Sequence, residues 1–108
     1  HEDALRRAVA NLVENALHFG TQCRITLRAL PDQPYVIEVD DNGPGIPPEE
    51  RDQMLQPFMR GDSSRSQAHE GFGLGLAIAS VITRGHRGTL TLGESDLGGL
   101  RVTITLPH

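Results

Sequence analysis

The chain has 108 residues, a formal net charge of −4 and a hydrophobic fraction of 37%, which indicates one small globular domain. The negative charge argues against a nucleic-acid partner, because no excess of basic residues offsets phosphate repulsion. Cys23 is the single cysteine, so an internal disulfide is excluded and a reducing compartment is favoured. No apolar run reaches the length of about 18 residues that a membrane-spanning helix needs.

A helix is predicted over residues 2–19. Its apolar residues recur at helical spacing and are Leu5, Ala8, Val9, Leu12, Val13, Ala16 and Leu17. Arg7, Asn11, Asn15 and His18 form a second stripe along another side. This stripe is either a solvated face or a functional one. Asparagine is unfavourable inside a helix, and paired carboxamides offer oxygens to a divalent metal and NH₂ donors to phosphates.

Alternating apolar and polar residues predict two antiparallel strands at 23–29 and 35–40, joined by a proline-containing turn. A short helix is expected over residues 47–55, because proline and acidic residues favour a helix start. Residues 56–70 show no hydrophobic periodicity. A loop of that length inside a compact domain is usually functional or disordered.

A second long helix is expected to follow the glycines at residues 71–75 and to end near Gly85 and Gly88. Its expected apolar face contains Leu74, Ala77, Ile78, Val81 and Ile82. Strands at 89–92 and 100–106 complete the chain. This order of elements predicts an α+β fold, a two-layer α/β sandwich whose mixed, mostly antiparallel sheet carries the helices on one face.

Two glycine-rich segments bracket the loop and predict a nucleotide pocket with a mobile lid. In the first, Asp41 lies between a strand end and the glycines Gly43 and Gly45. Its carboxylate can accept a hydrogen bond from an exocyclic amine, and the glycines let a flat ring lie against the backbone. The alternative is an ordinary turn aspartate. Asp40 is expected to point to the opposite side of the strand and to be structural.

The second glycine segment, residues 71–75, opens a helix whose free N–H groups can hold a phosphate. A dinucleotide-binding turn is disfavoured, because it needs a preceding strand and an acidic residue about 20 residues further on. A P-loop is disfavoured, because no Gly-Lys-Ser/Thr follows. The five histidines lack metal-ligand spacing, and no catalytic triad is visible.

Together these segments resemble the catalytic ATP-binding domain of bacterial sensor histidine kinases, which has the Bergerat ATP-binding fold. Four sequence boxes carry the resemblance: an N box at 11–19, a first glycine box at 41–47, an F box at 57–60 and a second glycine box at 71–78. The lid sequence is similar to kinases of the EnvZ and RstB type. The resemblance implies one domain over residues 1–108, an ATP lid at about 56–72, and a family strand that would precede residue 1 in a longer protein.

The resemblance also implies roles for individual residues. Asn15, assisted by Asn11, would coordinate Mg²⁺, and Asn11 would contact phosphate during catalysis. Asp41 would recognise the adenine amine, and Arg60 would stabilise charge on the γ-phosphate. The other implied ATP-binding positions are His18, Phe19, Gly43, Gly45, Ile46, Gly71, Phe72, Gly73, Leu74, Gly75 and Leu76.

The implied activity is transfer of the ATP γ-phosphate to a histidine on a separate dimerisation/phosphoacceptor domain. Asn11 is an amide where ATP-hydrolysing relatives carry a glutamate, which favours transfer over hydrolysis. The implied partners are that domain and a response regulator receiver domain. The full-length protein would be a homodimeric inner-membrane sensor, whereas this cytoplasmic domain alone would be monomeric and would not phosphorylate itself.

Two residues depart from the family pattern. His18 stands where lysine or arginine is frequent, and Phe72 replaces a small polar residue. They keep open the alternative of a non-catalytic nucleotide-binding signalling module. A serine kinase of the anti-sigma-factor type, which has the same fold, is a further alternative.

Overall fold

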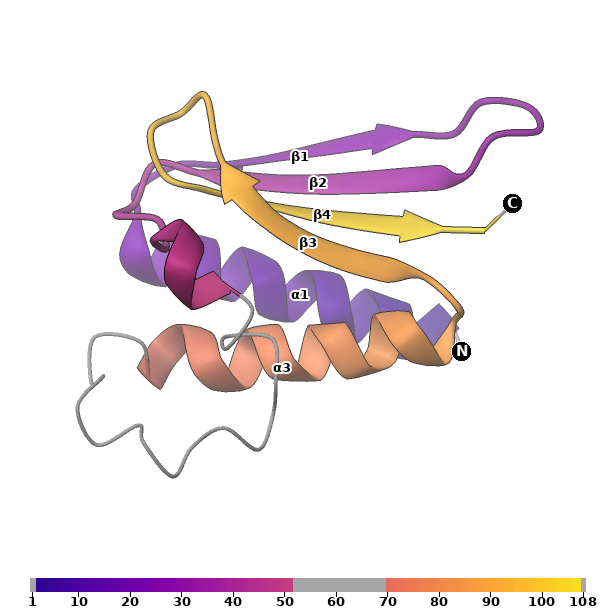
Figure 1. Cartoon of the computed structure of the whole chain (residues 1–108), viewed down its shortest axis with the longest axis horizontal. Coiled ribbons are helices and arrows are strands. Elements are labelled where there is room, and N and C mark those ends of the chain that lie inside the picture. The colour runs from indigo at the N-terminus through magenta and orange to yellow at the C-terminus, as the bar shows by residue number, and fades with distance from the viewer. Residues whose placement is uncertain (1, 52–69, 108) are drawn as a thin grey trace.

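The computed structural model describes residues 2–51 and 70–107, and residues 1, 52–69 and 108 lie outside the described part. Of Glu2 and residues 70–74, only the backbone is described. Two long helices lie side by side beneath a sheet of four strands (Figure 1). No helix within the described ranges is long and apolar enough to cross a membrane.

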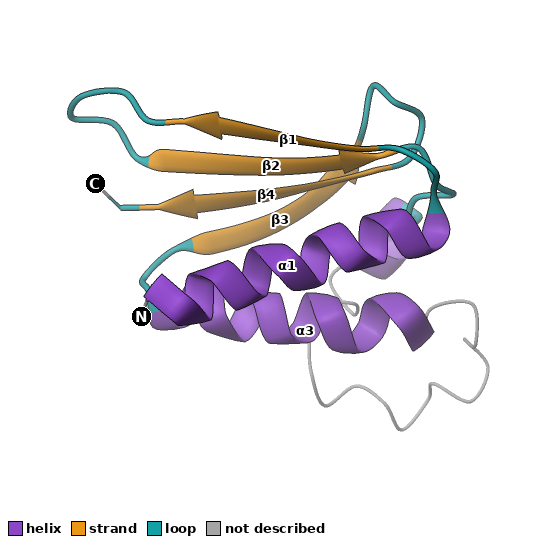
Figure 2. Cartoon of the chain, turned by 180° about the vertical axis from the view of Figure 1, so that it is seen from behind, coloured by secondary structure: helices purple, strands orange, loops and turns teal. Residues whose placement is uncertain are grey.

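The elements in chain order are α1 (Glu2–Phe19), β1 (Cys23–Arg28), β2 (Tyr35–Asp41), the 3₁₀ turn η1 (Pro48–Glu50), α3 (Glu70–Gly85), β3 (Thr89–Glu94) and β4 (Leu100–Leu106). The strand order is β1-β2-β4-β3, and each neighbouring pair is antiparallel. Both helices cover the same face of the sheet, as Figure 2 shows from behind. The predicted α+β two-layer fold is therefore confirmed.

The start of the second long helix differs from the prediction. α3 begins at Glu70, so the glycines that we expected to precede the helix lie within its first turns. Each glycine inside a helix costs about 1 kcal/mol relative to alanine. The packing of the rest of α3 offsets this cost. Of the short helix expected at 47–55, the structure describes η1, and the residues from Asp52 onward lie outside the described part.

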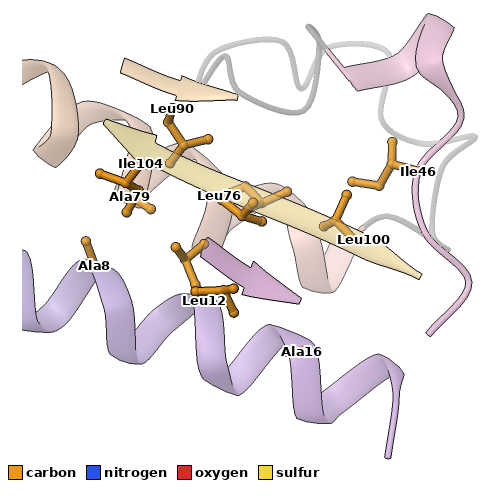
Figure 3. Packing of buried hydrophobic residues seen from close by; sticks show 11 residues of the cluster. Ala8, Leu12, Ala16, Ile46, Leu76, Ala79, Leu90, Leu100 and Ile104 are labelled. Atoms are coloured by element: carbon orange, nitrogen blue, oxygen red, sulfur yellow. The ribbon is translucent and has the colours of Figure 1, made fainter. Parts of the chain in front are cut away.

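The core fills the space between the helices and the sheet (Figure 3). Its buried residues are Ala8, Leu12, Ala16, Val39, Ile46, Leu76, Ala79, Leu90, Leu100, Val102 and Ile104. α3 contacts both α1 and the sheet side of the core, so it buries a broader face than the single stripe expected from the sequence. Val81, predicted to face the core, is 52% exposed, whereas the buried Thr83 donates its hydroxyl to the carbonyl of Ala79 at 2.7 Å.

The apolar face of β1 is also less buried than predicted. Ile25 and Leu27 are 51% and 66% exposed, and Leu17 of α1 is 53% exposed. β1 lies at the edge of the sheet, and α1 packs more extensively against β2 than against β1. The alternation of β1 therefore shows which face is apolar, but it does not show how much of that face is covered.

Candidate functional site

One end of the sandwich collects the site residues expected from the sequence. At the left edge of Figure 1, the end of β2 lies near the end of α1, the turn between β3 and β4, and the start of α3. Figure 2 shows the same elements together at its right edge. Because the antiparallel order alternates the strand directions, the end of β2 and the start of β4 meet at this edge.

Asp41 is the anchor of this end. It is 3% exposed, and its Oδ1 accepts hydrogen bonds from the N–H groups of Gly43 at 2.8 Å and Leu100 at 3.0 Å. Its backbone carbonyl accepts a third bond, from the N–H of Gly99 at 3.1 Å. Among the described residues, no group donates to its Oδ2. One carboxylate oxygen therefore fixes the side chain, and the other remains to accept a hydrogen bond from a ligand.

The backbone around Asp41 is packed too closely for side chains. A Cβ added at Gly99 would collide with the Asp41 carboxylate and would lie 2.5 Å from the Gly43 nitrogen. Gly45 has a φ of +74°, which favours glycine, and a Cβ there would lie 3.6 Å from the Gly99 carbonyl carbon. The loop after β2 and the β3–β4 turn therefore approach each other backbone to backbone. Such an arrangement suits a flat ring.

Asn42 holds this loop against the connection between α1 and β1. Its side-chain oxygen accepts the N–H groups of Thr21 at 2.8 Å and Gln22 at 2.9 Å. Its side-chain nitrogen donates to the Thr21 hydroxyl at 3.0 Å. Asn42 was not predicted as a site residue. Its partners lie about 20 positions earlier in the chain, so local turn chemistry does not predict these bonds.

Asn15 marks a second region, between the two helices. Its Nδ2 is buried and has no hydrogen-bond partner among the described residues, and a Cβ added at Gly75 would lie 2.5 Å from that nitrogen. The carboxamide is therefore held against the glycine backbone of α3. A buried amide without a partner costs about 1–3 kcal/mol. A half-turn of the carboxamide exchanges its nitrogen and oxygen, so the group can present either a donor or an acceptor to a ligand.

The other predicted positions on α1 surround Asn15. Asn11 is partly exposed one helical turn earlier. His18 is exposed near the end of α1, and its ring meets that of Phe19 edge to face at 4.6 Å between centroids. The described residues contain no group of three or more His, Cys, Asp or Glu that could hold a metal ion. A metal in this region would therefore depend on the carboxamides and on the ligand's own oxygens.

Two predicted contacts are core residues. Ile46 is 3% exposed and Leu76 is fully buried, so both side chains pack inside the domain beneath the site. For Gly71, Phe72, Gly73 and Leu74, the structure places the backbone in α3 and describes no side chain. The predicted lid residues 56–69, Arg60 among them, lie outside the described residues.

Asp40 points away from Asp41, as predicted, and lies fully buried on the open face of the sheet. Arg101 donates its Nε–H to Asp40 at 2.7 Å, and this bond is the main reason why the pKa of Arg101 is raised. Burial, followed by the charges of Asp41 and Asp40, raises the pKa of the Cys23 thiol. Cys23 packs against the core, as a small apolar residue does.

The chain is similar to known ATPases in sequence and in fold. The family described as "Histidine kinase-, DNA gyrase B-, and HSP90-like ATPase" matches the chain over residues 1–108. Sensor histidine kinase CpxA of Escherichia coli is 42% identical over 106 residues, which cover 97% of this chain and 23% of CpxA. The chain thus spans about a quarter of the length of that relative.

Two solved structures combine high coverage with the same fold. The histidine kinase domain of the E. coli osmosensor EnvZ is 44% identical, with a TM-score of 0.68, and the match covers 99% of this chain and 65% of that domain. The ATP binding domain of PrrB from Mycobacterium tuberculosis is 31% identical, with a TM-score of 0.79, over 99% of this chain and 69% of that chain.

Proposed function

The chain belongs to the histidine kinase-, DNA gyrase B- and HSP90-like ATPase family, and on this premise we propose that it binds ATP and donates the γ-phosphate to a histidine of a partner domain. The observation that carries the proposal is the carboxylate of Asp41, which is buried and anchored through Oδ1 while Oδ2 faces no described donor. The names of its relatives, which are sensor histidine kinases, support the kinase reaction over hydrolysis.

At the base end, Asp41 accepts the exocyclic amine of adenine through Oδ2. Gly43 and Gly45 form the wall of the slot, and the Gly99 backbone holds the Asp41 carboxylate in place. An anchored carboxylate favours a nucleobase that carries this amine over one that lacks it, since Oδ2 of Asp41 would stay unpaired with the second.

At the phosphate end, Asn15 and Asn11 would hold Mg²⁺ through their carboxamide oxygens, together with the nucleotide's own oxygens. The buried Nδ2 of Asn15, which no described residue satisfies, can donate to a phosphate oxygen, because a ligand would pair a donor that the described residues leave unpaired. Mg²⁺ supplies charge neutralisation to the transferring phosphates when it is bound. Asn11 is an amide and therefore a poor base, which disfavours activation of water and favours phosphate transfer. Arg60 remains a predicted contact of the γ-phosphate.

The acceptor histidine is proposed to lie in a dimerisation/phosphoacceptor domain of a longer homodimeric protein, with a response regulator receiver domain as the next acceptor. CpxA, of which this chain covers 23%, has ample length for such a domain. The same proposal places this domain on the cytoplasmic side of an inner-membrane sensor.

The test mixes this domain with a dimerisation/phosphoacceptor fragment and ATP labelled at the γ-phosphate. We expect an acid-labile, base-stable label on the partner's histidine, and no label when the domain is incubated alone. Acid-stable phosphoserine on a partner would instead select the serine-kinase alternative. ATP binding without any transfer in the full-length protein would select a non-catalytic signalling module.

A further inference from the structure

The face of the sheet opposite the helices carries an ionic network of four side chains: Arg24, Asp40, Asp96 and Arg101. Arg24, Asp40 and Arg101 stand in register across β1, β2 and β4. Asp40 lies between the two arginines and is fully buried, with Arg101 Nε at 2.7 Å and Arg24 Nη2 at 3.5 Å. Because removing one partner would leave a buried charge uncompensated, this part of the network is firmly fixed.

Asp96 extends the network from the sheet into the β3–β4 turn. Its Oδ1 accepts hydrogen bonds from Arg24 Nη2 at 2.5 Å and from Arg101 Nη2 at 3.2 Å. The bond from Arg24 lowers the pKa of Asp96, and the same bond raises the pKa of Arg24. The two arginines therefore tie this turn to the strands that flank Asp40.

The same turn contacts Asp41 on its other side. Gly99 donates its N–H to the backbone carbonyl of Asp41, and Leu100 donates its N–H to the carboxylate. Within the turn, the N–H of Ser95 donates to the Gly99 carbonyl at 2.8 Å, and the N–H of Gly98 donates to the Ser95 carbonyl at 3.0 Å. These bonds make the turn a rigid link between Asp96 and the donors that orient Asp41.

We propose that Arg24, Asp40, Arg101 and Asp96 form a positioning network that holds the β3–β4 turn and thereby orients the Asp41 carboxylate for recognition of the adenine amine. This inference rests on the proposed function. In this proposal, none of the four side chains touches the nucleotide. Asp40 and Asp41 are consecutive residues of β2 and point to opposite faces of the strand, so Asp40 belongs to the network and Asp41 to the nucleotide site.

A network that only stabilises the sheet and a network that positions Asp41 differ in one measurable respect. A stabilising network affects the unfolding midpoint alone. A positioning network also affects how strongly the protein prefers a base with the exocyclic amine. The preference is the ratio of the Kd for purine riboside triphosphate, which lacks the amine, to the Kd for ATP. The triphosphate and metal contributions cancel in this ratio.

The test measures that ratio for the variants Asp96→Asn and Arg24→Gln. Asp96 is exposed, so Asp96→Asn leaves the buried Asp40–Arg101 pair intact and keeps the chain folded. We expect the ratio to fall about three- to tenfold in both variants, the size of one misplaced hydrogen bond. Arg24→Lys should restore part of the ratio.

Arg28→Gln is the matched control. Arg28 lies on the same strand and the same face as Arg24, and its ion pair, with Glu38 at 3.4 Å, is separate from the β3–β4 turn. We expect this variant to keep the wild-type ratio. In the wild type, added salt should also lower the ratio, because it screens the exposed arginine–Asp96 contacts. Salt should affect the ratio of Asp96→Asn much less.

The outcomes separate the two proposals. A wild-type ratio retained in Asp96→Asn and Arg24→Gln, whatever their unfolding midpoints, would overturn the positioning network and leave the proposed function intact. A wild-type protein that binds ATP no better than purine riboside triphosphate would remove the base-recognition role of Asp41, and the network with it. A wild-type protein that binds neither nucleotide would contradict the proposed function itself.

Discussion

The two ends of the candidate site are built in opposite ways. At the base end, Asp41 receives three backbone hydrogen bonds, and close backbone packing at Gly99 fixes its surroundings. At the phosphate end, no described residue pairs with the buried Nδ2 of Asn15. The base end is therefore fixed before a ligand arrives, with Oδ2 of Asp41 left to accept a hydrogen bond, whereas the phosphate end carries a buried donor that no described residue satisfies.

This difference suits the chemistry proposed for each end. Recognition of a flat base gains from a slot fixed in advance, because little ordering is then required on binding. Phosphates and a hydrated metal bring their own strong donors and acceptors, so the protein can leave its amide unpaired until they arrive. We therefore expect the same small change, a single added methyl group, to have different consequences at the two ends.

Gly99→Ala should have the largest effect, because it disturbs the close-packed base end. The new Cβ would meet the Asp41 carboxylate and the Gly43 nitrogen, and neither can move without loss of a hydrogen bond. Overpacking of this kind costs about 1–3 kcal/mol of the free energy of unfolding. We expect that loss in urea denaturation and no measurable ATP binding by calorimetry.

Gly93→Ala is the control for this variant. Gly93 lies on β3, and a Cβ there would meet no atom of the described part of the chain within 4 Å. Its stability and its ATP affinity should stay near the wild-type values. If Gly99→Ala behaved like Gly93→Ala, the base end would not be the close-packed unit described above.

Asp41→Asn should leave the fold intact and remove the preference for adenine. The amide oxygen can still accept the N–H groups of Gly43 and Leu100, but an NH₂ donor replaces the free oxygen. A hydrogen bond to a charged group is worth about 1.5–3 kcal/mol, which corresponds to roughly a 10- to 150-fold weaker ATP affinity. Calorimetric titration, with thermal unfolding as the check on folding, measures this change. An ATP affinity within twofold of the wild type would assign the amine to another group.

The sequence predicted the arrangement around Asp41 better than the arrangement around Asn15, for a physical reason. Asp41, Gly43 and Gly45 are neighbours in the chain, so local spacing predicts that they lie together. The contact between Asn15 and Gly75 crosses 60 positions, and helical periodicity could place each residue on a face but could not pair the two faces. The hydrogen bond from the Gly99 N–H to the Asp41 carbonyl was not predicted for the same reason, because these residues are also far apart in the chain.

Prediction of the fold was limited in a similar way. The order of helices and strands and the antiparallel pairing were predictable, because periodicity reports which face of each element is apolar. Depth of burial was not predictable: Val81, expected on the apolar face of α3, is 52% exposed, and Leu27, on the apolar face of β1, is 66% exposed. Burial depends on which neighbouring element covers a face, and that is a property of the assembled layers.

Gly75→Ala tests the phosphate end. Its Cβ would push the Asn15 carboxamide out of place, while alanine's better helix propensity returns up to about 1 kcal/mol. We therefore expect little change in the unfolding midpoint and a roughly tenfold weaker affinity for ATP with Mg²⁺, the range seen when groups that orient metal ligands are altered. Titration of ATP with and without Mg²⁺ separates the metal contribution.

Gly85→Ala is the matched control in the same helix. No atom of the described residues lies within 4 Å of a Cβ at Gly85, so this variant gains helix propensity without touching Asn15. Its Mg²⁺-dependent affinity should equal that of the wild type. Equal losses in both variants would mean that α3 as a whole, and not the Asn15 contact, determines metal affinity.

The smallest effect is expected for Arg87, which lies outside both ends of the site. Variants of this residue show how much ATP affinity changes when only stability changes. Arg87, in the turn after α3, has a φ of +63°, a left-handed conformation that is unfavourable for a residue with a Cβ, and its N–H donates to the Arg84 carbonyl at 2.9 Å. Arg87→Gly relieves that strain but increases the conformational entropy of the unfolded chain. We therefore expect a net increase of about 0.5 kcal/mol in the free energy of unfolding, measured by urea denaturation. Arg87→Val, which is β-branched, should lose stability instead. Neither variant should change ATP affinity, because the turn after α3 is at the opposite end of that helix from Gly75. A change in affinity that followed stability in these two variants would mean that binding reports the rigidity of the whole domain, and the contrast between a prearranged base end and an unpaired phosphate end would lose its basis.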